Sequence, residues 1–166
     1  MFRKIEDFKK AWKYETEATH KLFSSLTDTS LGQQVTADGR SLGFLAWHIT
    51  LTVGEMPGHV GLKADAPAED APTPEKAADI AAAFERAAAS LAVEVEKNWN
   101  DDTLTQTDEM YGEIWTRGET LFYLIAHQTH HRGQMTVLMR QAGLAFAGIY
   151  GPAKEEWAAM GIPAMP

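Results

Sequence analysis

Residues 116–143 read TRGETLFYLIAHQTHHRGQMTVLMRQAG, and this stretch decides the fold. Thr116 and Glu119 have the spacing of a capping box, the paired side-chain and backbone hydrogen bonds that begin many helices. Gly143 is typical of the residue just past a helix end, because glycine readily adopts the left-handed conformation found there. The spacing therefore predicts one long helix from Thr116 to about Gln141.

Three earlier segments repeat apolar residues at intervals of three and four, which is the period of an amphipathic helix. The second of them begins at Ser41, an acceptable N-cap, and the third opens with Thr73 as N-cap and Pro74 as its first residue. No alternating stretch is long enough for a central strand, and residues 100–116 read as irregular with a turn near 110–113. The helices expected are about 2–26, 41 to about 58, a third from 74 with a stripe that reaches Val95, and 116 to about 141, followed by a short helical turn at 155–160.

The chain has 166 residues, which is the length of one ordinary domain. Residues 64–74 contain several prolines and alanines and read as a crossover between two helices. Four long helices with short-to-medium connections predict an all-α fold, a four-helix bundle with a short C-terminal helical tail. We expect residues 1–166 to form this single domain.

Composition narrows the chemistry that the chain can carry out. It has no cysteine and 6 histidines, which excludes disulfides, thiolate metal sites, iron–sulfur clusters and a cysteine nucleophile. Lys and Arg number 15 against 23 Asp and Glu, and the formal charge of −8 gives nucleic-acid binding little electrostatic support. Neither a signal peptide nor a membrane span is recognisable, so we expect a cytoplasmic protein without a membrane partner.

Histidines are concentrated in the predicted fourth helix. His127 and His131 are four residues apart, so their side chains differ in direction by about 40° and their Cβ atoms lie about 6 Å apart. This spacing lets two imidazoles close on one metal ion. His130 is three residues from His127 and is the other possible partner, although it points about 100° away from His131. In a bundle a third ligand comes from a neighbouring helix, and His48 lies on the apolar stripe of the second.

Three neutral imidazoles with an open coordination position are the ligand set of a catalytic metal rather than of a closed structural site. The same histidines are also compatible with purely structural roles. His48 on an apolar face can be a hydrogen-bonded core residue, and two histidines four residues apart also occur by chance. His20 and His59 have no partner at helical spacing, so we expect both at the surface.

Four further side chains are candidates to line a pocket or to hydrogen-bond the metal ligands, with no catalytic role assigned to any of them. These are Glu15, Glu55, His130 and Gln134. Glu55 shares a helix face with His48, but it lies about 10 Å along the axis, which is too far for a comfortable co-ligand. Trp12 and Trp115 are candidates for the wall of a pocket.

Three stretches together carry a family resemblance: residues 127–134 (HQTHHRGQ), Trp47-His48-Ile49, and residues 149–152 (IYGP). In their order and spacing the chain resembles, over nearly its whole length, the DinB-like (YfiT-like metalloenzyme) family. The resemblance implies an up-down-down-up four-helix bundle with a long crossover. It also implies a metal held by His48, His127 and His131, and a homodimer.

Three functions are compatible with this resemblance and with the residues. The first is a metal-dependent thiol S-transferase, in which a divalent ion (Zn, Ni or Fe) activates a low-molecular-weight thiol such as bacillithiol, mycothiol or glutathione against a small electrophilic substrate. The second is a hydrolase that uses a metal-activated water, for which Glu15 and Glu55 are the only carboxylates on plausible inward faces. The third is a metal- or ligand-binding protein without enzymatic activity.

Overall fold

The computed structural model describes residues 1–163, so residues 164–166 of the domain expected over 1–166 lie outside the described part. Four long helices dominate it, as predicted, and their bounds are α1 Ile5–Phe23, α2 Leu42–His59, α3 Ala77–Asn98 and α4 Arg117–Gln141. Short 3-10 turns, η1 to η4, are Asp28–Ser30, Thr103–Thr105, Lys154–Glu156 and Ala158–Met160. The last two confirm the short helical tail.

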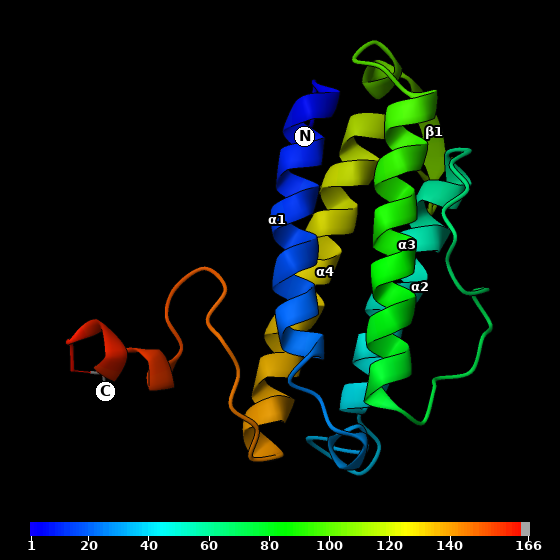
Figure 1. Cartoon of the computed structure of the whole chain (residues 1–166). Coiled ribbons are helices and arrows are strands. Elements are labelled where there is room, and N and C mark those ends of the chain that lie inside the picture. Colours follow the sequence, from blue (N-terminus) through cyan, green and yellow to red (C-terminus); the bar gives the residue numbers. More distant parts are fainter. Residues whose placement is uncertain (164–166) are drawn as a thin grey trace.

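The four helices form the bundle that the resemblance implies. α1 and α2 each pack against both α3 and α4, which puts α1 and α2 at opposite corners. In Figure 1, α1 and α4 run in one direction and α2 and α3 in the other, which is an up-down-down-up arrangement. The connection between α2 and α3, residues 60–76, passes along the outside of the bundle and forms the long crossover (Figure 1). No helix within residues 1–163 is long and apolar enough to cross a membrane.

The predicted start of the fourth helix is confirmed. The backbone N–H of Glu119 donates to Thr116 Oγ1 over 3.2 Å, and the N–H of Thr116 donates to Glu119 Oε2 over 2.7 Å. Gly143 follows the helix with φ +75°, in the left-handed conformation that ends many helices. Residues 127 and 131 therefore lie well inside a helix that is fixed at both ends.

The predicted start of the third helix, at Thr73 and Pro74, is wrong. The helix begins at Ala77, and its N-cap residue Lys76 makes no side-chain capping hydrogen bond. Instead the N–H of Ala77 donates over 2.9 Å to Oδ1 of Asp28, 49 residues earlier in the chain. An acceptor from another segment satisfies the helix end, and no local sequence signal could reveal it.

Residues 100–116 are not wholly irregular, because they contain an antiparallel hairpin of two short strands, β1 (Thr107–Met110) and β2 (Glu113–Thr116). The turn expected near 110–113 is present: Tyr111 and Gly112 connect the strands with φ of 55° and 83°. Two successive positive φ angles are typical of the tight turn that matches the twist of a hairpin. Four-residue strands are too short to show a persuasive alternation, which is why the pattern missed them.

The core between the helices is rich in aromatic residues. Phe8 stacks on Trp12 with ring centroids 5.8 Å apart, and Phe23 meets Phe84 across α1 and α3 at 5.2 Å. All four rings are almost fully buried. Fully burying one such side chain contributes about 1.5–3 kcal/mol, so this packing fixes the helices that carry the polar side chains described next.

Candidate metal centre

Three histidines from two helices meet between α2 and α4. Nε2 of His127 lies 3.1 Å from Nε2 of His48 and 3.0 Å from Nε2 of His131. One ligand atom from each residue lies within 4.8 Å of the other two, and this group can hold a metal ion. His127 and His131 face α2 together because they are four residues apart on α4. The structure thus brings together the three histidines that the spacing singled out, which we call the histidine triad.

The surroundings of the triad favour uncharged imidazoles. Burial, together with the neighbouring His131 and His48, lowers the pKa of His127 to about 4. Burial also lowers the pKa of His48 and of His131 below the ordinary value for histidine. At neutral pH each ring therefore keeps a free lone pair, which is the form that binds a metal ion.

The donor atoms fit a divalent transition metal. Tetrahedral coordination with metal–nitrogen bonds of about 2.0–2.1 Å places two nitrogens about 3.3 Å apart, close to the 3.1 and 3.0 Å spacings around His127 Nε2. Nδ1 of His131 lies 2.7 Å from Oε1 of Gln134, a contact that fixes the orientation of the ring. The Nε2 of that ring is thereby directed into the triad. Three imidazole nitrogens suit Zn, Ni or Fe, and the donor set does not choose among them.

A pocket of about 640 Å³ opens beside the triad, between α2 and α4. His48 and His127 border it on one side, and side chains of the hairpin and of both helices line the rest, among them Glu55, Glu69, Tyr111, Trp115, Tyr123 and His130. Trp115 therefore lines this pocket as expected. Trp12 lines a different pocket, between α1 and α3, and donates its Nε1–H to the carbonyl of Ala88.

Glu55 lies in the pocket wall and is engaged by two side chains. The Tyr111 hydroxyl donates to its two carboxylate oxygens over 2.7 and 2.9 Å, and Nε2 of His59 lies 3.1 Å from Oε1. Burial and the hydrogen bond to this carboxylate raise the pKa of Tyr111, so its hydroxyl keeps its proton. The expectation that His59 has no partner at helical spacing is wrong, because Glu55 precedes it by four residues on α2.

Gln134 connects the triad with its remaining histidine neighbour. Its Oε1 contacts His131, and its Nε2 lies 3.1 Å from Nε2 of His130. His130 also lines the pocket, but it does not join the three histidines whose ligand atoms converge.

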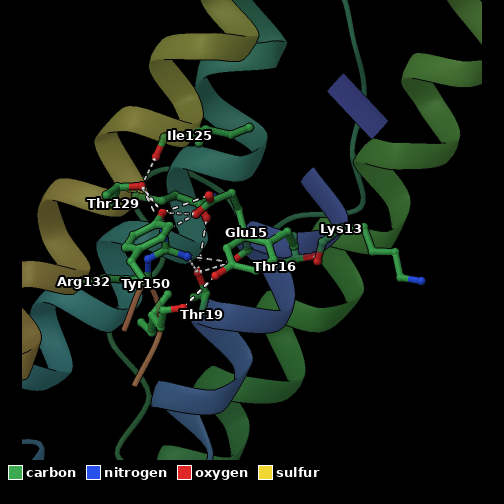
Figure 2. Close-up of polar contacts among 11 residues, drawn as sticks. Lys13, Glu15, Thr16, Thr19, Ile125, Thr129, Arg132 and Tyr150 are labelled. Atoms are coloured by element: carbon green, nitrogen blue, oxygen red, sulfur yellow. Dashed lines mark hydrogen bonds and ion pairs between the residues drawn. The ribbon is translucent and has the colours of Figure 1, made fainter. Parts of the chain in front are cut away.

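Glu15 lies away from the pocket, in a buried polar cluster between α1 and α4 (Figure 2). Its carboxylate pairs with Arg132 and accepts from the Tyr150 hydroxyl over 2.7 and 2.9 Å. Arg132 also donates to the Glu15 carbonyl over 2.7 Å and to Thr19 Oγ1 over 3.1 Å. Arg132 follows His131 in the sequence, so α4 presents the triad to α2 and this cluster to α1.

Sequence reasoning missed Tyr111, Tyr123 and Glu69 in the pocket, and Tyr150 in the buried cluster. Tyr111 and Glu69 have no periodic or motif signal, because they reach the pocket only when the hairpin and the crossover pack near α2 and α4. Tyr123 did have a signal, because it lies four residues before His127 on α4 and so shares its helix face. Tyr150 did have a signal: it lies within the IYGP stretch of residues 149–152, next to a proline and a glycine.

A family model and known proteins match this chain over almost its whole length. A model of the DinB family matches residues 1–165. An uncharacterized protein of Bacillus subtilis strain 168, YrdA, is 46% identical over 164 residues, which are 99% of this chain and 98% of that protein. The crystal structure of a DinB-like protein from Bacillus cereus ATCC 10987 superposes with a TM-score of 0.87 at 39% identity, over 90% of this chain and 100% of that one. A second DinB-like structure, YjoA from Bacillus subtilis, shares the fold alone, with a TM-score of 0.65 and 15% identity over 82% of this chain and 92% of that one.

Proposed function

The chain belongs to the DinB family, and from this premise we propose that it is a metal-dependent thiol S-transferase acting on a small electrophilic substrate. His48, His127 and His131 would hold one divalent transition metal ion, Zn, Ni or Fe. The observation that carries the proposal is the position of three converging, uncharged imidazoles at the side of a pocket of about 640 Å³. Three protein ligands leave a coordination position for a substrate.

A divalent ion, when bound, supplies positive charge that lowers the pKa of a thiol or a water molecule. The protein has no cysteine, so the sulfur belongs to a second substrate. In the net reaction one carbon–sulfur bond forms and the bond from that carbon to its leaving group breaks. The leaving group departs with the electron pair, and the thiol proton passes to it or to solvent. Leu51, Met56 and the aromatic side chains of the pocket would bind the carbon skeleton of the electrophile and exclude water.

One observation favours a hydrolase as the second candidate. Glu55 is a carboxylate in the pocket wall, and a hydrolase needs a general base near its attacking water. Glu15 cannot serve as that base, because it pairs with Arg132 between α1 and α4. Glu55 already accepts hydrogen bonds from Tyr111 and contacts His59, which is why we place the transferase first.

The test is a mass-spectrometric assay of the metal-loaded protein with 1-chloro-2,4-dinitrobenzene and, in turn, bacillithiol, mycothiol, glutathione and coenzyme A. We expect at least one thiol to give the thioether faster than the uncatalysed reaction, with the acceleration lost after chelation and in His127→Ala. His20→Ala is the matched control, because His20 lies on α1 beside Glu85 and away from the pocket. Hydrolysis of an ester panel that needs metal and Glu55 but no thiol would instead support the second candidate, and acceleration that survives chelation would refute both.

A further inference from the structure

We propose that the part of the pocket formed by Glu55, Tyr111, Trp115 and Tyr123 binds an alkylammonium group, a protonated or methylated amine on the substrate. These four residues are called the aromatic cage below. The inference names a substrate class for the same pocket and to that extent rests on the proposed function. Ammonium binding needs no metal, however, so the two are tested separately.

The first support is the arrangement of the rings. Tyr111 meets Trp115 edge-on with centroids 5.7 Å apart, and Trp115 meets Tyr123 at 4.6 Å with a tilt of 42°. Tyr111 is 59% exposed and Tyr123 37% exposed, so part of each side chain remains accessible to a ligand. The three rings thus pack against one another along the pocket wall. An accessible aromatic face attracts cations through its quadrupole, and aromatic sites recognise alkylammonium ligands in this way.

The second support is the charge of the pocket. Two carboxylates, Glu55 and Glu69, line it, and among the residues that the structure describes no lysine or arginine does. The side chain of Glu55 is only 19% exposed, and it lies against the Tyr111 hydroxyl. His59 contacts Glu55, and His130 also lines the pocket. An ammonium group would form an ion pair with the carboxylate and a cation–π contact with the rings. An anionic group would meet no lysine or arginine side chain in the lining of this pocket.

The third support is the backbone of Tyr111. Its φ of 55° places it in the left-handed region, at a hairpin position where Asn, Asp and Gly are favoured. A bulky residue kept in such a conformation is found where the strain serves a site. At this position the ring faces Trp115 and His59, and the hydroxyl reaches Glu55. The turn would tolerate Asn better, so the tyrosine is best explained by what its side chain contacts.

A second copy of the chain could also cover exposed rings, but the charge of the cage argues for a small cation. Covering Glu55 with an apolar protein surface would remove a carboxylate from water without giving it a cationic partner. An ammonium group supplies that partner and remains small enough for the pocket.

The experiment compares tert-butylammonium with tert-butanol, which has a similar shape and no charge, by isothermal titration calorimetry and by NMR titration. We expect the cation to bind the metal-free protein about tenfold more tightly than the alcohol. We also expect Glu55→Gln to remove most of that preference, and Tyr111→Asn to weaken cation binding about tenfold while the protein stays folded. Glu85→Gln, which removes an exposed carboxylate on α3 far from the pocket, is the matched control and should change nothing.

Equal binding of the cation and the alcohol, or a preference that Glu55→Gln leaves intact, would overturn the inference. Cation-dependent dimerisation, measured by analytical ultracentrifugation of the same samples, would also overturn it in favour of a second copy. Retained ammonium binding in a protein that takes up no metal would refute only the proposed function. Metal uptake without ammonium binding would refute only this inference.

Discussion

At the scale of single residues, the buried ion pair between Arg132 of α4 and Glu15 of α1 lies directly beside the histidine triad. Arg132 is 2% exposed and is bonded to the side chain and the carbonyl of Glu15 and to Thr19. Its neighbour His131, about 100° further round α4, belongs to the triad. The pair therefore lies in the same turn of α4 as the triad and contributes to the packing that holds the histidines in place.

Arg132→Met tests this pair. It leaves the Glu15 carboxylate buried without a cationic partner, and breaking a buried pair in this way costs about 3–5 kcal/mol. Urea unfolding should show that loss, and adding Glu15→Gln should restore much of it because the unpaired charge is gone. Arg140→Met is the control, since Arg140 pairs with Glu155 at the exposed surface, where ion pairs add little. A loss in the double variant as large as in the single one would contradict the explanation.

At the scale of elements, the ends of the helices separate what sequence can and cannot predict. Thr116 and Glu119 are three residues apart, so the start of α4 follows from local pattern. The start of α3 does not, because Asp28 supplies its acceptor from η1, far along the chain. Thr73 and Pro74 have the residue types of a helix start, but both lie before the first residue of α3.

Asp28→Ala distinguishes these two explanations of the start of α3. Losing the acceptor for the Ala77 amide should lower the free energy of unfolding by about 0.5–2 kcal/mol, the usual cost of a lost helix cap. Thr73→Ala should leave it nearly unchanged, because Thr73 is exposed and precedes the helix. Chemical denaturation of both variants measures the difference. A larger effect at Thr73 would mean that the local signal does operate in solution.

Within the candidate site, too, some residues can be predicted from local sequence and others depend on contacts between distant segments. The triad could be predicted because His127 and His131 share one helix and His48 lies on a regular apolar stripe. Of the aromatic cage, Glu55 and Trp115 could be predicted as pocket residues, whereas Tyr111 could not, because it comes from a hairpin whose placement depends on packing. Glu15 was misplaced as a pocket candidate because its inward face points to Arg132, and helical period alone does not say which neighbour an inward face meets.

At the scale of the whole molecule, the chain after α4 leaves the bundle (Figure 1). Side-chain contacts of Tyr150, together with the Tyr14–Ile149 hydrogen bond and the Arg140–Glu155 ion pair, attach it to α1 and α4. The Tyr150 hydroxyl contacts Glu15, Arg132 and Thr129 (Figure 2), and the Tyr14 hydroxyl donates to the carbonyl of Ile149 over 2.6 Å. These contacts tie the segment to the face of α4 that meets α1, beside the face that carries the triad.

Tyr150→Phe removes the hydroxyl while keeping the ring. We expect faster amide hydrogen exchange in residues 144–160, whose attachment it weakens, and little change in the exchange of α2 and α3. Tyr123→Phe is the matched control, because Tyr123 belongs to the pocket and not to this cluster. Unchanged exchange in residues 144–160 would show that the hydroxyl does not hold the segment.

The central claim is that the histidine triad holds one metal ion. The most direct measurement is the metal content of the purified protein after incubation with Zn²⁺ and removal of excess ion, determined by inductively coupled plasma mass spectrometry alongside His48→Ala, His127→Ala, His131→Ala and His20→Ala. We predict one ion per chain in the parent protein and in His20→Ala, and far less than one in each triad variant, all of which should remain folded by circular dichroism. A full ion per chain in His127→Ala would contradict the assignment.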